Sequence, residues 1–454
     1  MQKFNNSNRK NLARILTLLL VLAFSITAAN AQKAGNANRT TIVNAARILD
    51  VKSGKYLNDY AVLIVNGRIQ KIASRNELAR AATKDANIVN LPNATLLPGL
   101  IDVHTHLLDE RRAALEFYEN NIVRILQRAE TERMSLGERA AREMIESGWT
   151  TVRDLGDATN CDDLKLRDRI NAGQIVGPRM LVSCKKLTPP GGQHIRPTSE
   201  ITQQIAQREY FEIRTADDAR RAVAEDKRLG ADVIKVIVDD DMKVIGLEEM
   251  RAIVEAAHGA KLKVAAHAHI LASVRVAVEA GADSVEHAYE ISDELLQKMR
   301  ERKIYLVPTD ITEAAVDDLL AKSLPPNGEL RPEIKKYREE LVEKAPERLK
   351  RAITAKVLLA AGSDTAWEWS GKTRGEQSDL IFDAYRKAGM SPLEIIRAAT
   401  LNAADLLGLS ESVGSIDANK FADLIAVEGD PLANFAALKR VVFVMKNGEI
   451  LKNR

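Results

Sequence analysis

The sequence predicts an α/β protein, a (β/α)8 TIM barrel with a small β-sandwich domain formed from both chain ends. The middle of the chain, 97–409, alternates apolar strand patterns with helical patterns, as a parallel barrel requires. Strands of alternating polarity flank it at 40–96 and 410–454. The alternative for the middle segment is a doubly wound open sheet, but no glycine-rich phosphate loop follows its first strand.

The two flanks carry the signals of one β-domain shared by both ends. Asn66-Gly67 and Asn447-Gly448 each separate two apolar runs, and such a pair supplies the positive φ angles of a tight hairpin turn. The strands expected here are 41–50, 61–65, 68–73, 422–427, 441–445 and 449–451.

Helix-ending signals separate eight expected strands in the middle segment. Gly148, Gly230 and Gly281 each stand before a strand, where the end of a helix favours positive φ. Thr215 and Asp218 form the pattern of a capping box. The expected strands are 99–104, 149–154, 179–184, 232–238, 262–266, 284–286, 304–308 and 357–361. The clearest helices are 135–146, 215–228, 247–258 and 392–406.

Composition indicates a globular protein that acts on small molecules. With 454 residues, of which 45% are hydrophobic and 28% charged, the chain can bury a large core. The formal charge is only +3 and aromatic residues make up 4%, so the basic, aromatic-rich stripe of a nucleic-acid-binding protein is absent from the sequence. We expect a small-molecule or dipeptide substrate and no nucleic acid, and a homo-oligomer stays open.

The first residues have the three parts of a secretory signal peptide. An uncharged apolar stretch, 15–29, is followed by the small-x-small site Ala29-Asn-Ala31. Positive charges precede it at Lys3, Arg9, Lys10 and Arg14. We expect a signal peptide over 1–31, a linker over 32–39, and a periplasmic or secreted product without membrane attachment. The alternative is an uncleaved anchor, although the apolar stretch is near the lower length limit for a membrane span.

Six potential metal-site residues lie at or near strand ends in the middle segment. His104 and His106 close the first strand, and residues two apart on an extended backbone point to the same side. Lys235 lies within an apolar run of the fourth strand, where a bare ammonium would be costly. The fifth, sixth and eighth strands end at His267, His287 and Asp364. All six would meet at the C-terminal face, where barrel enzymes build their sites.

Three strings carry a family resemblance when they occur together. They are 97–106 (LPGLIDVHTH), 285–287 (VEH) and 362–365 (GSDT). In combination they resemble the metal-dependent amidohydrolase superfamily, and within it the imidazolonepropionase-like and Xaa-Pro dipeptidase (prolidase-like) branch. The resemblance covers nearly the whole chain after the leader, including the β-domain at both ends.

The resemblance implies two divalent metal ions. The nitrogen-rich ligands with carboxylates favour zinc, and manganese, cobalt and iron are the alternatives for the same site. His104, His106 and Asp364 match the ligands of the more buried ion, and His267 and His287 match those of the other. An ammonium has no lone pair, so Lys235 would bridge the ions only as a carbamate formed with carbon dioxide. A bridging hydroxide would then attack the substrate carbonyl, with Asp364 as general base and later general acid.

Two further histidines are candidates with open roles. His269 would face the same way as His267 and competes with it as a ligand, although the family pattern favours His267. His194 follows a glycine-rich loop in which the relatives place a histidine that contacts the substrate carbonyl. Here Gln193 separates it from Gly192, so His194 is either catalytic and substrate-binding or a solvated loop residue.

An acidic run and two cysteines also have open interpretations. Asp239, Asp240 and Asp241 stand where many relatives have a glycine pair. They either select a cationic group of the substrate or form a solvated loop. Cys161 and Cys184 match no zinc module, and both a disulfide and two buried thiols stay open.

The expected function is hydrolysis of a small amide, a dipeptide or dipeptide-like compound of Xaa-Pro or Xaa-basic type. The enzymatic alternative is opening of a cyclic amide ring, as in imidazolonepropionase. Relatives with that activity use one metal and lack the bridging lysine, so Lys235 counts against it. A metal-retaining but inactive binding protein is the third hypothesis, and the six intact positions argue against it.

Overall fold

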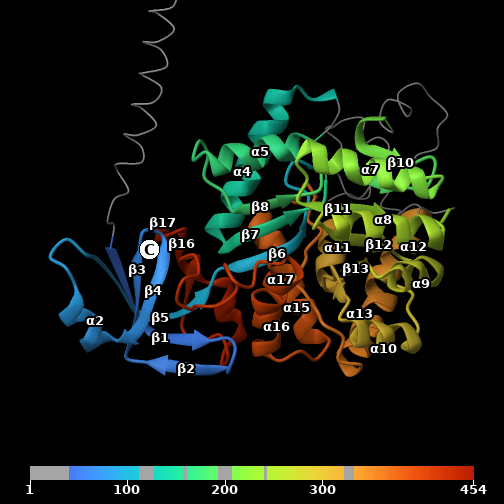
Figure 1. Cartoon of the computed structure of the whole chain (residues 1–454). Coiled ribbons are helices and arrows are strands. Elements are labelled where there is room, and N and C mark those ends of the chain that lie inside the picture. Colours follow the sequence, from blue (N-terminus) through green and yellow to red (C-terminus); the bar gives the residue numbers. More distant parts are fainter. Residues whose placement is uncertain (1–39, 112–126, 157–160, 193–206, 240–242, 322–331) are drawn as a thin grey trace, which may run out of the picture.

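The computed structural model describes residues 40–111, 127–156, 161–192, 207–239, 243–321 and 332–454. The predicted signal peptide and linker, His194, Asp240 and Asp241 lie outside these ranges. In Figure 1 a sheet from the two chain ends lies beside a larger unit of strands and helices. In the described parts of the chain, no helix combines the length and the hydropathy needed to cross a membrane.

One hydrogen-bonded sheet of eight strands combines both ends of the chain, in the order β17-β16-β15-β5-β1-β3-β4 with β2 paired to β1. Its strands are β1 (Thr40–Asp50), β2 (Lys55–Asn58), β3 (Tyr60–Val65), β4 (Arg68–Ser74), β5 (Asn87–Pro98), β15 (Leu424–Glu428), β16 (Val441–Lys446) and β17 (Glu449–Asn453). Both predicted hairpins are confirmed, because Asn66, Gly67, Asn447 and Gly448 all have positive φ. The division of this sheet into two sandwich layers stays a prediction.

The middle segment contributes parallel strands. One sheet has the order β6-β7-β8 and the other β10-β9-β11-β12-β13-β14. These strands are β6 (Leu100–Thr105), β7 (Trp149–Asp154), β8 (Arg179–Val182), β9 (Lys186–Thr188), β10 (Tyr210–Glu212), β11 (Val233–Ile237), β12 (Lys263–Ala268), β13 (Ser284–His287) and β14 (Tyr305–Val307). The short strands β9 and β10 were not predicted. The Asp232 backbone N–H donates to the Val182 carbonyl at 2.8 Å and joins the two sheets.

The eighth predicted strand, 357–361, forms only an isolated bridge, at Leu359. The segment nevertheless lies between β14 and β6, because Leu306 N–H donates to Leu358 and Val103 N–H donates to Ala361. Gly362 allows this close approach, since a Cβ there would lie 2.8 Å from the Cβ of His104.

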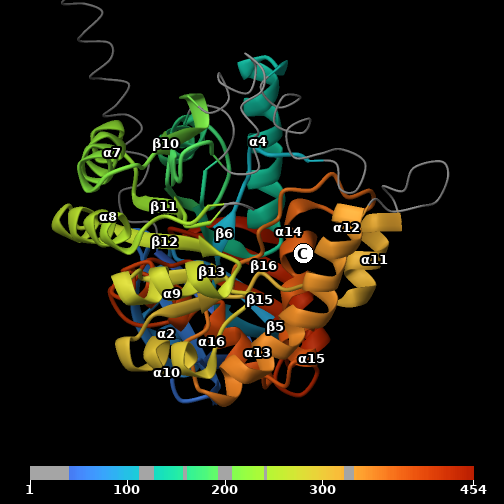
Figure 2. The ribbon, with the colours of Figure 1, turned by 90° about the vertical axis from the view of Figure 1, so that its right-hand side faces the viewer.

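Helices cover the outside of the parallel strands (Figure 2). They are α4 (Glu130–Glu146), α5 (Asp162–Asn171), α7 (Ala216–Leu229), α8 (Leu247–Gly259), α9 (Leu271–Ala280), α10 (Asp293–Arg302), α11 (Glu313–Ala321), α12 (Pro332–Glu339), α13 (Ala345–Thr354), α14 (Arg374–Ser378), α15 (Leu380–Lys387), α16 (Pro392–Ala398) and α17 (Leu401–Leu406). Shorter pieces are α2 (Arg75–Ala81), the π-turn Glu340–Lys344 and the 3₁₀ turn Phe435–Lys439.

Local signals set several helix ends. Thr215 and Asp218 form the predicted capping box at the start of α7, and Gly230 ends that helix with a φ of +103°. The predicted helix 392–406 is two helices, because the backbone leaves helical geometry at Thr400, whose ψ is −86°. The Thr400 hydroxyl donates to the Ile396 carbonyl, and such a bond competes with regular helix geometry.

Cys161 and Cys184 form a disulfide, with their Cα atoms 4.5 Å apart. Cys161 directly precedes α5, and Cys184 follows β8. The bond therefore joins the connections that follow two neighbouring parallel strands, on the same face as the candidate site.

Candidate metal centre

The C-terminal ends of the parallel strands bring the predicted metal-site residues to one face. They come from β6, β11, β12, β13 and the segment after 361. Strands β11, β12 and β13 are adjacent in one sheet, and the segment that leads to 361 lies between β14 and β6. The residues are His104, His106, Lys235, His267, His269, His287 and Asp364. Two groups of three among them could each hold a metal ion, with their ligand atoms within 4.8 Å of one another.

The first group is His104, His287 and Asp364, so it shares His287 with the second group, and the Asp364 carboxylate also lies beside His106. Its Oδ1 lies 3.5 Å from His104 Nε2 and 3.1 Å from His106 Nε2. The Asp364 backbone N–H donates to the His104 carbonyl at 2.8 Å, and its φ is +53°. A non-glycine residue held at positive φ is costly, and such strain is concentrated at functional sites.

Neighbouring groups keep Asp364 ionised, and burial keeps His104 neutral. Burial by itself would raise the pKa of Asp364, but His104 and His106 hold it well below its usual range. Burial, assisted by the nearby Lys235, lowers the pKa of His104 to about 4. An ionised carboxylate beside neutral imidazoles is the donor set that a divalent transition metal requires.

Hydrogen bonds at Nδ1 leave the Nε2 lone pairs of the first two histidines for a metal. His104 Nδ1 lies 2.8 Å from Glu286 Oε2. His106 Nδ1 lies 2.5 Å from the Gly156 carbonyl, which can only accept. A donor role at Nδ1 fixes the tautomer in which Nε2 is unprotonated, as in many metal sites.

His287 has the same arrangement. Its Nδ1 lies 2.8 Å from Thr309 Oγ1, which uses its own proton to bond the Pro308 carbonyl at 2.7 Å. The hydroxyl oxygen must therefore accept from His287. His287 itself has a φ of +70°, so the strand ends in a turn that presents the ring to the site.

Glu286 and Arg153 support His104 from the interior, and we did not identify them from the sequence. Glu286 Oε1 accepts from an Arg153 nitrogen at 2.9 Å, and both side chains are fully buried. Burial by itself would raise the pKa of Glu286, but Arg153 and His104 lower it to about 2. Charged residues within the apolar strands 149–154 and 284–286 were the available signal, because buried charges need partners.

Lys235 lies on β11 with 2% of its surface exposed. Its Nζ is 3.5 Å from His104 Nε2. Burial lowers its pKa to about 8, although Glu286 and Asp364 act in the opposite direction. Its head group is therefore within reach of any ion that His104 would bind.

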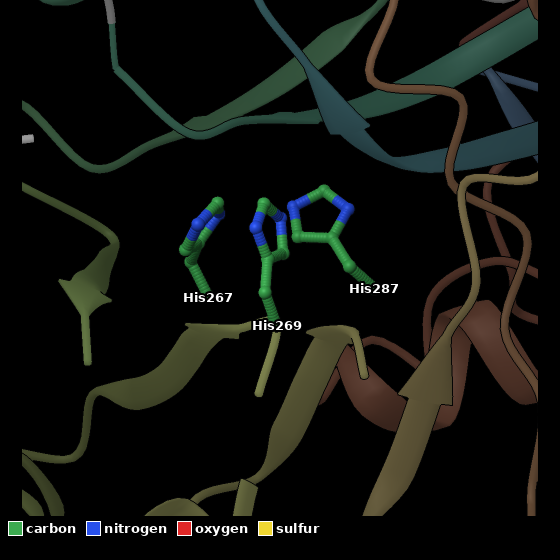
Figure 3. Close-up of side chains that lie close together, drawn as sticks. All are labelled: His267, His269 and His287. Atoms are coloured by element: carbon green, nitrogen blue, oxygen red, sulfur yellow. The ribbon is translucent and has the colours of Figure 1, made fainter. Parts of the chain in front are cut away.

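The second group consists of three imidazoles, from His267, His269 and His287 (Figure 3). The ring centroids are 4.2 Å apart for His267 and His269, 4.6 Å for His267 and His287, and 4.9 Å for His269 and His287. Three nitrogen donors are a typical set for zinc and similar ions.

Only one residue of the predicted substrate contacts lies in the described ranges. Asp239 is 4% exposed, and its Oδ1 accepts from the His269 backbone N–H at 3.0 Å. Asp239 is thus a buried support of the loop after β12 and not a solvated charge. His194, Asp240 and Asp241 lie outside the described residues.

Comparisons with known proteins agree with this architecture. Residues 95–451 match the sequence model of a family described as "Amidohydrolase family". Ochratoxinase from Aspergillus niger is 31% identical over 447 residues, covering 91% of this chain and 87% of that protein. An imidazolonepropionase from Fusobacterium nucleatum subsp. nucleatum is 25% identical, covering 87% and 92%. The solved structure of a Xaa-Pro dipeptidase with bound methionine superposes with a TM-score of 0.78, at 25% identity, covering 91% and 100%. The middle segment is therefore an α/β domain of the TIM-barrel type.

Proposed function

The chain belongs to the amidohydrolase family, and on that premise we propose that it hydrolyses the amide bond of a dipeptide or dipeptide-like compound. It is a hydrolase that acts on carbon–nitrogen bonds. The observation that carries the proposal is the placement of the Asp364 carboxylate against two neutral imidazoles, beside a group of three histidines. The relatedness to a Xaa-Pro dipeptidase supports a dipeptide substrate.

We propose two divalent ions, zinc by preference, bound by His104, His106 and Asp364 on one side and by His267 and His287 on the other. A carbamate on Lys235 would bridge them. Bound ions would supply an activated water at neutral pH.

Residues of the chain itself then transfer the proton of the attacking water and orient the histidines of the site. The side chain of Asp364 is 32% exposed, whereas that of His104 is buried. Its ionised carboxylate takes the proton of the attacking water and delivers it to the leaving nitrogen. Glu286 and Thr309 hold His104 and His287 in the tautomers that keep Nε2 toward the site.

A panel of substrates tests the proposed activity. Zinc-loaded protein is incubated with Xaa-Pro dipeptides, Xaa-Lys and Xaa-Arg dipeptides and imidazolonepropionate, and release of products is measured. Turnover of the dipeptides supports the proposal. Turnover of imidazolonepropionate alone would favour the alternative suggested by the imidazolonepropionase relative. Absence of turnover with stable metal binding would favour a binding protein.

We also propose that Asp240 and Asp241 favour substrates with a cationic side chain. Replacing both by Asn is expected to lower kcat/KM for Arg- and Lys-containing dipeptides about two- to fivefold more than for neutral ones, since an ion pair screened by water contributes about 0.2–1 kcal/mol. Asp239→Asn is the matched control, since Asp239 supports the His269 backbone and should affect both substrate classes alike. If the double variant lowers kcat/KM equally for cationic and neutral substrates, the interpretation of Asp240 and Asp241 as part of a solvated loop is favoured instead.

We propose that the protein is exported and cleaved after Ala31. The Cys161–Cys184 disulfide supports an oxidising compartment. N-terminal sequencing of protein from the cell envelope or medium of the native host is expected to begin at Gln32. A membrane-bound product that retains Met1 or Gln2 would contradict export with cleavage.

We further propose that the parallel strands close into a complete barrel and that the terminal sheet is a β-sandwich. Hydrogen bonds from β14 and β6 to 357–361 support closure. The terminal sheet has its own apolar cluster, including Val43, Leu96 and Phe443, which supports two layers.

A further inference from the structure

A second His-Xaa-His pair stands at the end of β12. His267-Ala-His269 repeats the spacing of His104-Thr-His106, and in both pairs the first histidine belongs to a parallel strand. Residues two apart on extended backbone project to the same side. The family pattern uses both histidines of the first pair and assigns only His267 in the second, so the role of His269 is not assigned.

The geometry around His269 is that of a fixed residue turned toward the site. Its backbone N–H donates to the Asp239 carboxylate at 3.0 Å, and its carbonyl accepts from Glu290 N–H at 2.9 Å. The Tyr289 ring lies 4.8 Å away, centroid to centroid. The chain on each side of His269 is therefore held, and the imidazole lies beside those of His267 and His287 (Figure 3).

We propose that His269 is the third imidazole ligand of the ion held by His267 and His287. This half of the centre then has three imidazole donors for a divalent transition metal, with positions left for water and for the proposed carbamate of Lys235. The inference rests on the proposed function only in placing an ion at His267 and His287, and it does not depend on the substrate.

Metal binding, not turnover, tests this assignment. Cobalt(II) is titrated into metal-free His269→Asn, wild-type protein and His258→Asn, with binding followed by calorimetry and by the visible cobalt spectrum. His258 is the matched control. It lies in the last turn of α8, and its imidazole bonds Asp283, away from the site. Loss of the ligand is expected to weaken one of the two sites at least about 100-fold, whereas losing an orienting partner weakens a site about 10–100-fold.

The spectrum of His269→Asn should also change, since the cobalt coordination changes, while His258→Asn should match wild type. An unchanged spectrum, or an affinity loss of less than about 100-fold, would overturn the assignment. If His269→Asn does not fold, a crystal structure of the zinc-loaded wild-type protein decides. A His269 nitrogen at about 2.1 Å from zinc supports ligation, and a separation above about 3 Å excludes it.

The outcomes separate this inference from the proposed function. Two ions bound equally well with and without His269 contradict only the inference. Three-histidine coordination in a protein that cleaves none of the amides contradicts only the proposed activity. A wild-type protein that binds no divalent metal contradicts both.

Discussion

Replacing Asp364 by Asn is expected to lower kcat by about 10²- to 10⁴-fold while leaving the metal content nearly unchanged. Removal of a general acid–base group costs rate enhancement of this size. The Asn amide keeps an oxygen where Asp364 Oδ1 now lies, 3.1 Å from His106 Nε2, but it cannot take a proton at neutral pH. Steady-state kinetics and elemental analysis of the same preparation measure both quantities.

The matched control is Asp283→Asn. This variant also removes a carboxylate that accepts several hydrogen bonds, from Val264, Lys263 and His258. Asp283 directly precedes β13, however, so it lies at the N-terminal end of that strand, opposite to the site. This variant should keep kcat, even if its stability falls. A near-normal kcat for Asp364→Asn would exclude the proton-transfer role. A parallel loss of metal and activity would mean that Asp364 acts mainly as a ligand.

The sequence predicts which residues gather at the site, and there is a physical reason for this. His104, His267 and His287 each end an apolar run that can be identified as a parallel strand, and the C-terminal ends of parallel strands meet on one face. The structure brings these residues, Lys235 and Asp364 within a few ångströms of one another. The periodicity of the sequence therefore predicts that these side chains lie close together, but it does not predict their orientation.

Orientation depends on contacts that periodicity does not contain. Arg153 and Glu286 are 133 residues apart in the sequence, and they meet only because the fold brings strands β7 and β13 together. The positive φ angles of His287 and Asp364 are likewise not indicated by periodicity, since such angles are uncommon for any non-glycine residue, although Asp and His adopt them more often than most. Asp239 is buried and accepts a hydrogen bond from the His269 backbone, which a run of three aspartates does not indicate.

The irregular eighth strand is a related case. The apolar run 357–361 predicted a strand, and the backbone does bond both neighbours. Regular pairing is confined to one bridge at Leu359, and beyond it Gly362 lies close to His104 and Asp364 adopts a positive φ beside the same residue.

Replacing Lys235 by Ala is expected to reduce the metal content from about two equivalents toward one and to lower activity strongly. The ammonium of a buried lysine cannot ligate, but its neutral amine can react with carbon dioxide to give a carboxylate-like head. Lys235 is fully enclosed on β11, and its Nζ lies 3.5 Å from His104 Nε2. Elemental analysis gives the metal content, and adding a short carboxylic acid to the variant should restore part of the activity by occupying the bridging position.

The alternative is a structural lysine paired with a carboxylate such as Asp364. Within the ranges that the structure describes, Lys235 Nζ forms no such ion pair, and its hydrogen-bond partner is the ring of His104. Lys446→Ala is the matched control, because burial also lowers the pKa of Lys446 to about 8, yet its Nζ bonds the Gly177 carbonyl beside the terminal sheet. This variant should keep two ions and normal turnover. The bridging role fails if fully active wild-type protein contains a single ion and Lys235→Ala retains it with unchanged kcat.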